Sequence, residues 1–561
     1  MANWRFYKEI KIYKKKQFFY VENLWKTARI IFCATIIVVF ERFHRVRWTL
    51  LFRACNQARA NSGLVFMRFH RVRWTLLFWS CRNSDLGVKY SIMENKNSWL
   101  KYDNTKQIMD FAEDYRKFIS QNKIERECAA FFIEQARKDG YISIEEARSK
   151  GKKLKAGDKV YASAMGKIVA FFQIGKKPLE DGMNILGAHI DSPRLDIKQN
   201  PLYEDNGLAL LDTHYYGGIK KYQWVTLPLA LHGVVAKKDG TVVNVVIGED
   251  EREGVLGVSD LLIHLSADQL EKRGNKVVEG EALNILVGSI PLKADSSKAS
   301  KGSKDEEKKN PVKENILKIL KKKYGIDEAD FLSAELEAVP AGTAKNYGLD
   351  NSMIMAYGQD DKVCAYPSWR AIQGLPKTER TAVCLLVDKE EIGSVGATGM
   401  HSRFFENAVA EVYELCGGYS ELALRRALAN SNMLSSDVSA AFDPNYPDVM
   451  EKKNACFLCR GIALNKFTGS RGKSGSNDAN AEFVAKVRKI FDDAEASFQL
   501  CELGKVDQGG GGTIAYIMAN YGMNVIDSGV GVLNMHAPWE ITSKVDIYES
   551  LKGYRAFLVN A

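Results

Sequence analysis

The sequence predicts an α/β protein in which a mixed sheet is sandwiched by helices and a β-rich domain is inserted. Short apolar runs alternate with helical patterns in the first and last parts of the body, whereas residues 203–335 hold mainly strand-like segments. The length of 561 residues is too great for a single core, so two or more domains are expected. The apolar content of 46% and charged content of 26% are those of an ordinary globular protein.

Residues 1–92 differ in composition from the rest of the chain. They hold 18 Lys and Arg but 4 Asp and Glu, and the stretch 42–52 recurs unchanged at 68–78. The apolar run 30–40 is shorter than the about 20 residues that span a bilayer. We expect residues 1–92 to be a non-native or disordered extension, with Met93 as the true start. The alternative is a basic arm that binds nucleic acid or a membrane surface.

The charge of the remaining chain gives no indication of a nucleic-acid partner. Residues 93–561 carry 61 Lys and Arg against 65 Asp and Glu, although the whole chain has a net charge of +10. Of the ten cysteines, only Cys456 and Cys459 form a CxxC pair, and buried free thiols are favoured over a zinc or redox site. Reduced thiols fit a cytoplasmic protein, so we expect that location and no membrane partner.

The segments before residue 203 predict helices and then strands. Residues 104–148 have apolar side chains at helical spacing, and residues 159–175 alternate as strands do. An apolar strand then leads into His189-Ile-Asp191, and Pro193 ends it. The alternative for His189 is a hydrogen-bonded core histidine, but the His-x-Asp spacing lets a carboxylate orient a metal-bound imidazole.

Residues 203–335 predict the inserted β-rich domain, flanked by two parts of a catalytic domain at 93–202 and 336–561. Strands are expected over residues 242–247, 261–265 and 283–287, separated by turn residues. A charged stretch at 293–313 predicts a solvated, mobile loop, and a helix is expected over 314–324.

After residue 345 strands and helices alternate again, and acidic residues follow the strands. Asp360 begins a helix, and Glu390 and Glu391 follow an apolar strand at 381–387. An exposed acidic turn is the alternative for this pair, but open α/β sheets bind ligands at the carboxyl ends of their strands. Further helices are expected over residues 402–416, 479–494, 513–521 and 543–558.

Residues of one chemical kind gather at these predicted strand ends. They are His189, Asp191, Asp360, Glu390, Glu391, Asp437 and His536. Carboxylates and imidazoles without thiolates suit Zn²⁺, Mn²⁺ or Co²⁺. Five ligands are too many for one open zinc site but suit two ions that share a bridging carboxylate and activate a water. A further Glu would take the proton of that water to a leaving amine.

Five motifs in this order, GAHIDSPRLD, GQDD, DKEEIGS, SSD and NMHAPWE, resemble those of the M18 family of metallo-aminopeptidases, in the bacterial-type branch related to aspartyl aminopeptidase. The resemblance extends from about residue 99 to the C-terminus and does not cover residues 1–92. It implies the dinuclear-zinc exopeptidase fold and hydrolysis of the N-terminal residue of peptides. Two divalent ions are implied, with Zn²⁺ expected and Co²⁺ or Mn²⁺ as alternatives.

The resemblance also implies which side chains hold the ions. One ion would be bound by His189, Asp360 and Asp437. The other would be bound by Asp360, Glu391 and His536, with Asp360 rather than Asp361 as the bridge. Glu390 would be the general base, and Asp191 would orient His189.

In the family, the inserted domain forms dimers that assemble into a tetrahedral dodecamer, and one of its histidines reaches a neighbouring subunit's site. His264 matches that histidine, and a strand histidine on a polar face is the alternative. Lys466 matches a basic residue of the substrate pocket of aspartyl aminopeptidases. Ala440 and Asp443 stand where those enzymes carry histidines, so acidic, neutral and basic first residues all stay open. A catalytically silent scaffold is the alternative function, and the presence of every expected ligand argues against it.

Overall fold

The computed structural model describes residues 96–250, 252–293, 309–469 and 471–561, and the backbone of four strands nearer the N-terminus. The chain divides into two compact units, Met1–Met93 and Glu94–Ala561. In the first unit, antiparallel pairs are formed by β1 (Ala34–Phe40) with β2 (Trp48–Ala54) and by β3 (Val65–Phe69) with β4 (Val72–Leu76). The predictions of a non-native or disordered extension and of a mobile loop at 293–313 lie largely outside the described residues.

A mixed sheet of nine strands forms the centre of the second unit. Its order is β21 (Phe498–Cys501), β20 (Ile462–Asn465), β22 (Asn524–Gly529), β18 (Asn432–Ser435), β8 (Met183–His189), β17 (Thr381–Val387), β7 (Ile168–Gln173), β6 (Lys159–Ala164) and β5 (Ile142–Ser143). The four strands β22, β18, β8 and β17 are parallel, so their carboxyl ends meet at one edge. The predicted strand 381–387 has the bounds of β17.

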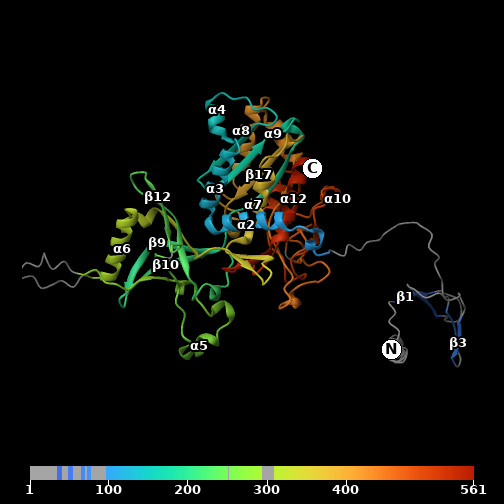
Figure 1. Ribbon diagram of the computed structural model, residues 1–561, viewed down its shortest axis with the longest axis horizontal. Helices are drawn as coiled ribbons and strands as arrows, with labels where there is room; N and C mark the ends of the chain where they lie inside the picture. Colours follow the sequence, from blue (N-terminus) through green and yellow to red (C-terminus); the bar gives the residue numbers. More distant parts are fainter. Residues whose placement is uncertain are drawn as a thin grey trace, which may run out of the picture. The chain divides into compact units, whose positions relative to one another are not determined.

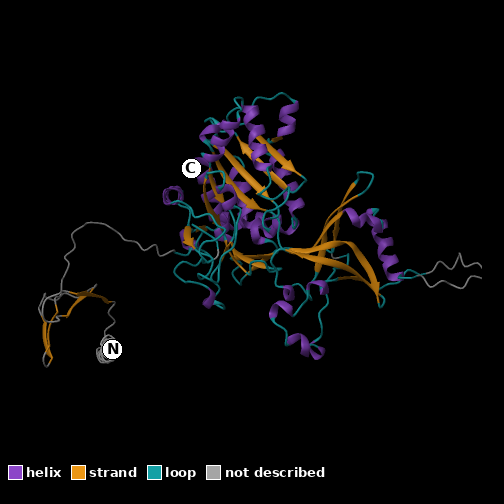
Figure 2. Cartoon of the chain, turned by 180° about the vertical axis from the view of Figure 1, so that it is seen from behind, coloured by secondary structure: helices purple, strands orange, loops and turns teal. Residues whose placement is uncertain are grey.

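Helices cover both faces of this sheet, as Figure 2 shows. One face packs against α2 (Lys106–Gln121), α3 (Glu125–Lys138), α7 (Gln359–Ile372), α10 (Ala481–Asp493) and α12 (Lys544–Asn560). The other packs against α4 (Ile144–Ser149), α8 (Phe404–Cys416), α9 (Glu421–Ala429) and α11 (Ala515–Ala519). Because side chains alternate along a strand, β17 contributes Cys384 and Leu386 to the first core but Val383 and Leu385 to the second. The predicted helix-covered sheet is confirmed.

A second, antiparallel sheet extends away from this body (green strands in Figure 1). Its order is β12 (Val242–Ile247), β11 (Leu229–Ala236), β14 (Ala334–Pro340), β9 (Arg194–Asp205), β10 (Leu208–Tyr216) and β13 (Ile285–Gly288). The helix α6 (Pro311–Tyr324) packs against β9, β10 and β13, and the short α5 (Ala267–Leu270) lies between β12 and β13 in the chain. Domain boundaries at 202/203 and 335/336 stay a prediction.

The strand predicted over residues 261–265 is wrong. Ile263–Leu265 form a 3-10 turn, in which the amide of Leu265 donates to the carbonyl of Leu262 over 3.0 Å. A strand needs a neighbouring strand to share its hydrogen bonds, and among the described residues the pairing nearest in the chain is the isolated bridge between Gly257 and Leu286 of β13. The apolar side chains remain accessible in the chain: Ile263 and Leu265 are both 68% exposed.

A small third sheet brings three distant parts of the chain together. Its order is β15 (Lys345–Tyr347), β16 (Met353–Ala356), β24 (Glu540–Ser543), β23 (Gly531–Leu533) and β19 (Ser439–Ala440). Asp360 follows β16 by four residues, Asp437 precedes β19, and His536 lies between β23 and β24. The pairing of these strands therefore sets three of the predicted site residues beside one another.

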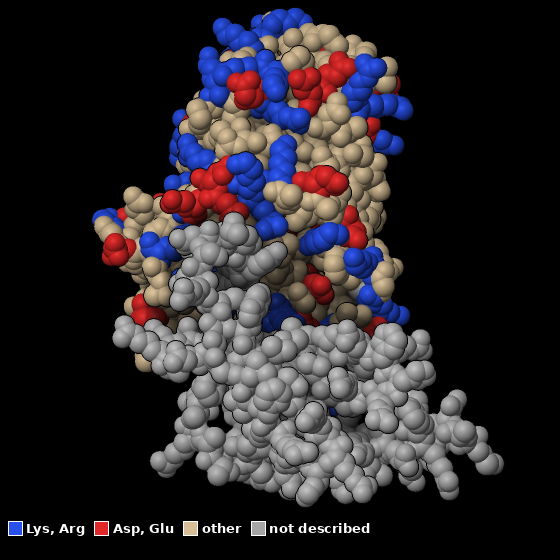
Figure 3. All heavy atoms as spheres, turned by 90° about the vertical axis from the view of Figure 1, so that its right-hand side faces the viewer, with Lys and Arg blue, Asp and Glu red and all other residues tan. Residues whose placement is uncertain are grey.

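The described surface carries charges of both signs. On the described part of the face in Figure 3, Lys and Arg side chains are interspersed with Asp and Glu. Among the described residues, no helix combines the length and the apolar character needed to cross a membrane.

Candidate metal centre

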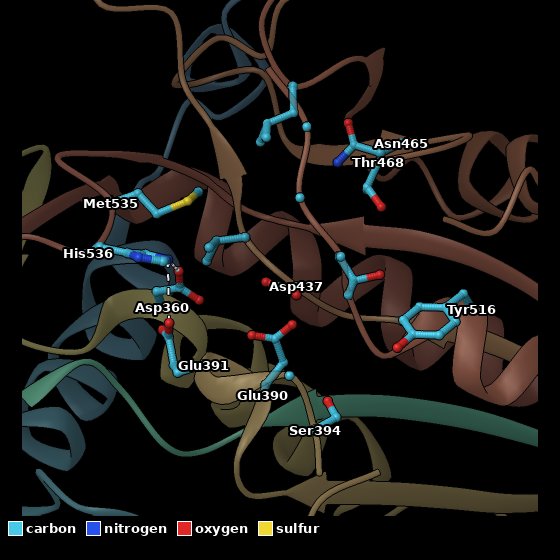
Figure 4. Close-up of a pocket in the computed structure, with 17 residues that line it drawn as sticks. Asp360, Glu390, Glu391, Ser394, Asp437, Asn465, Thr468, Tyr516, Met535 and His536 are labelled. Atoms are coloured by element: carbon cyan, nitrogen blue, oxygen red, sulfur yellow. Dashed lines mark ion pairs between the residues drawn. The ribbon is translucent and has the colours of Figure 1, made fainter. Parts of the chain in front are cut away.

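Five of the predicted side chains line one cavity of about 440 Å³ (Figure 4). They are Asp360, Glu390, Glu391, Asp437 and His536. His189, at the carboxyl end of β8, is 1% exposed and contacts Asp360. The two glutamates lie in a 3-10 turn, Glu390–Ile392, that follows β17. The parallel strands β8, β17 and β18 therefore deliver their terminal residues to one place, as open α/β sheets do.

His189 faces three carboxylates through one ring nitrogen. Its Nε2 lies 3.1 Å from Asp360 Oδ1, 3.9 Å from Glu390 Oε2 and 4.0 Å from Asp437 Oδ1. Its other nitrogen, Nδ1, lies 3.2 Å from Asp191 Oδ1 and 3.1 Å from the Asp191 carbonyl oxygen. Asp191 thus holds Nδ1 and leaves Nε2 directed at the carboxylate cluster.

His536 contacts the other carboxylate oxygen of Asp360. Its Nε2 lies 3.4 Å from Asp360 Oδ2 and 3.6 Å from Glu391 Oε2, the pairs drawn as dashed lines in Figure 4. Its Nδ1 is 2.9 Å from the carbonyl oxygen of Gly218. Asp360 therefore lies between two imidazoles and presents one carboxylate oxygen to each.

Crowding of buried carboxylates perturbs the acids of this cluster. Burial, reinforced by neighbouring carboxylates, raises the pKa of Glu390 to about 7 and those of Glu391 and Asp437 well above their usual range. Burial acts in the same direction on Asp360, but hydrogen bonds from His189 and His536 lower its pKa. Conversely, burial disfavours the charged form of His536, yet Asp360 and Glu391 raise its pKa to about 10. The site concentrates negative charge, which bound cations would offset.

The donor atoms of the cluster fit a metal centre. Groups of three with every ligand atom within 4.8 Å of the others are His189–Asp360–Glu391, His189–Glu390–Asp437 and Asp360–Asp361–Asp437. The Oε1 atom of Glu391 is buried and has no hydrogen-bond partner among the described residues. Imidazole nitrogen with carboxylate oxygen is a donor set that suits Zn²⁺, and Co²⁺ and Mn²⁺ accept it too. A carboxylate oxygen left unpaired in such a cluster is available as a ligand.

Two predicted site residues lie apart from this cluster. His264 is exposed within the 3-10 turn Ile263–Leu265. The ammonium of Lys466 pairs with Asp478, and Lys466 is absent from the residues that line the cavity. Its neighbours Asn465 and Thr468 do line the cavity. The roles of His264 and Lys466 stay predictions.

One buried residue that the sequence did not single out joins two parts of the centre. The Glu540 carboxylate accepts the backbone N–H of His536 at 2.8 Å and that of Asp360 at 3.1 Å. Burial and the nearby Asp360 charge raise the pKa of Glu540 to about 8. The sequence signal for Glu540 was its position at the end of the NMHAPWE motif. That motif does not reveal the contact with Asp360, which is distant in the sequence.

Comparison with known proteins finds M18 aminopeptidases that match most of this chain. The model of the family "Aminopeptidase I zinc metalloprotease (M18)" matches residues 118–558. A Clostridium acetobutylicum protein named probable M18 family aminopeptidase 1 is 61% identical over 471 residues, 84% of this chain and 99% of the relative. The crystal structure of C. acetobutylicum aminopeptidase I is 58% identical with a TM-score of 0.76, covering 83% of this chain and 99% of that one. The M18 aminopeptidase structure from Thermotoga maritima is 42% identical with a TM-score of 0.78, covering 84% and 100%.

Proposed function

Because the chain belongs to the M18 family of zinc metallo-aminopeptidases, we propose that the cluster around Asp360 binds two divalent ions and removes the N-terminal residue from peptides. The protein is a metal-dependent aminopeptidase rather than a silent scaffold. The observation that carries the two-ion proposal is the position of Asp360, whose two oxygens face different imidazoles at 3.1 and 3.4 Å.

The donors are proposed to form two ligand sets that share Asp360. His189 Nε2 lies 3.1 Å from Asp360 Oδ1 and 4.0 Å from Asp437 Oδ1, whereas His536 Nε2 lies 3.4 Å from Asp360 Oδ2 and 3.6 Å from Glu391 Oε2. Zinc is the proposed metal, with Co²⁺ or Mn²⁺ as alternatives that the same donors accept. When bound, the two ions would polarise the scissile carbonyl and lower the pKa of the attacking water.

Glu390 is the proposed general base. Its side chain is 16% exposed and lines the cavity beside the proposed ligands, where a carboxylate can accept a proton and later donate it. It takes a proton from the attacking water as the new C–O bond forms. It then gives that proton to the leaving nitrogen as the C–N bond breaks. Asp191 has the proposed role of holding the His189 imidazole.

The cavity favours a peptide whose first side chain is uncharged. Its acidic residues belong to the metal cluster, where a free N-terminal amine would pair with them. The remaining wall consists of uncharged residues: Gly393, Ser394, Val438, Asn465, Thr468, Leu503, Gly510, Gly511, Gly512, Thr513, Tyr516 and Met535. Lys466 keeps its predicted role in binding an acidic side chain only if it leaves Asp478.

A homo-oligomer is the proposed assembly, with dimers that build a tetrahedral dodecamer and His264 reaching a neighbouring site. The surroundings of His264 support an interface, because Leu261, Leu262 and Leu265 are 46%, 53% and 68% exposed. Adjacent exposed apolar side chains of this kind mark association surfaces. A cytoplasmic location is proposed as well.

Hydrolysis of aminoacyl reporters by the purified full-length chain tests the function. The chain, loaded in turn with Zn²⁺, Mn²⁺ and Co²⁺, should release the chromophore from leucyl and alanyl reporters and should lose activity with a chelator. The same reporters acetylated at the amine are the control and should stay intact. Cleavage of both kinds at equal rates, or of neither, would contradict the proposal. Light scattering on the same sample measures the oligomeric state.

A further inference from the structure

We propose that the end of β10, from Tyr216 to Gly218, is a positioning element that holds both imidazoles of the metal site and thereby sets its metal affinity. The inference rests on the proposed function in one respect, that the cluster binds metal. The three residues belong to the six-stranded sheet and its exit, whereas His189 and His536 come from the body. Three neighbouring residues therefore connect one sheet to two ligands that are far apart in the sequence.

Tyr216 acts on His189 through Asp191. Its hydroxyl donates to Asp191 Oδ2 over 2.9 Å, and Asp191 is fully buried. The same carboxylate accepts the backbone N–H groups of Glu390 and Glu391, each at 3.2 Å, and faces His189 Nδ1. The Tyr216 hydroxyl thus helps to fix a carboxylate that positions one imidazole and the backbone of two cluster residues.

The ring of Tyr216 is itself held firmly. Tyr216 is 7% exposed and pairs in register with Arg194 of β9, whose guanidinium carbon lies 3.8 Å from the centre of the Tyr216 ring. That guanidinium is 2.8 Å from Asp196, 3.0 Å from Glu337 and 3.5 Å from Glu125. A buried guanidinium with several carboxylate partners has little freedom to move. The hydroxyl of Tyr216 therefore approaches Asp191 from a rigid support.

The next two residues act on the other imidazole and on its carboxylate partner. The Gly218 carbonyl accepts the hydrogen bond from His536 Nδ1 over 2.9 Å, which leaves Nε2 free to face Asp360 and Glu391. Gly217 has a φ of +75°, and a Cβ added there would lie 3.3 Å from both Cβ and Oε2 of Glu391. A glycine at this position lets the backbone pass close to Glu391 without displacing it.

These contacts give both imidazoles the same arrangement. In each ring Nδ1 is taken by an oxygen acceptor and Nε2 faces the carboxylates, so the tautomer that can ligate through Nε2 is favoured. Groups that hold the second nitrogen of a metal-binding histidine typically change metal affinity or activity by about 10- to 100-fold when they are removed. A shift of the β10 end would disturb both rings together.

Tyr216→Phe tests the proposal, because it removes one oxygen and keeps the ring over Arg194. Zinc affinity, measured by competition with a chromophoric chelator on the full-length chain, should fall by about tenfold or more. The melting temperature of the metal-free protein should stay near that of wild type. On a leucyl reporter at saturating zinc, kcat should fall while KM changes little, and the visible spectrum of the Co²⁺-loaded protein should shift. Tyr215→Phe is the matched control, since Tyr215 is 40% exposed on the opposite face of β10.

Gly217→Ala tests the other half of the positioning element. The added methyl should weaken binding of the ion that Glu391 is proposed to hold. Zinc titration of Gly217→Ala should therefore show that site weakened, whereas titration of Tyr216→Phe should show the site of His189 weakened. Wild-type zinc affinity and an unchanged Co²⁺ spectrum in Tyr216→Phe would overturn the inference. A fall in the metal-free melting temperature without a change in affinity would overturn it too, because Tyr216 would then be only structural. If wild type itself binds no zinc and cleaves no reporter, the proposed function fails instead.

Discussion

Replacing Glu390 with Gln should abolish most turnover while the ions stay bound. The change keeps the size of the side chain but removes the group that accepts and releases the proton. Glu390 lines the cavity and belongs to neither proposed ligand set, whereas Asp360 contacts both imidazoles at 3.1 and 3.4 Å. We therefore expect a change in proton transfer and little change in metal binding.

The size of the effect follows from the role. A positioned general base typically contributes about 10²- to 10⁴-fold to the rate, which corresponds to about 3–5 kcal/mol in the activation free energy. We expect kcat on a leucyl reporter to fall by that factor while KM changes by less than about threefold, because binding of the amine and carbonyl would not involve the Glu390 proton. Initial rates measured at several reporter concentrations separate kcat from KM.

The assay combines kinetics with elemental analysis of the same sample. Mass spectrometry of the purified Glu390→Gln protein should give the wild-type number of zinc ions per subunit. Glu391→Gln is the matched control, since it alters the adjacent carboxylate that faces His536 at 3.6 Å, and it should lose zinc as well as activity. Parallel loss of zinc and turnover in Glu390→Gln would refute the assignment. Glu390 would then be a ligand, as its grouping with His189 and Asp437 permits.

Three further predictions use the same protein. Asp360→Ala should lower the affinity for both ions, because Asp360 faces both imidazoles. If a chelator titration shows that one ion stays tightly bound, Asp360 does not bridge the two ions. In a panel of reporters that differ in the first residue, those with an uncharged first residue should be cleaved fastest, because the cavity wall outside the cluster is uncharged. Lys466→Ala should leave those rates within about twofold of wild type. Fastest cleavage of aspartyl and glutamyl reporters would contradict this prediction. Burial lowers the pKa of His232, but its hydrogen bonds to Glu127 and Glu249 raise the pKa overall. His232 therefore stabilises the fold fully below its unfolded pKa of about 6.5. This contribution is lost as the pH rises through the raised pKa of the folded state. Urea unfolding of wild type and His232→Gln should therefore show a stability difference at pH 6 that shrinks by pH 9, and a difference that grows with pH would contradict this.

Local patterns in the sequence predicted the bounds of several strands and helices. The strand over 381–387 and the strand over 242–247 have their predicted bounds, and the last helix, Lys544–Asn560, lies within two residues of the prediction. Residues 261–265 have the same apolar character but form no strand. The pattern alone does not reveal whether a neighbouring strand is available, because strand pairing is a contact between distant segments.

The identity of the cluster was likewise present in the sequence, since imidazoles and carboxylates were found at strand ends. Its geometry was not. Only the fold places Asp360 between His189 and His536, brings Glu540 beneath both Asp360 and His536, and carries Tyr216 from another sheet to Asp191. Apart from His536 and Glu540, these contacts join residues that lie 25 to 180 positions apart, and such distances are set by strand order and packing rather than by local sequence. The sequence determined which chemical groups are available, and the tertiary structure decided which of them meet.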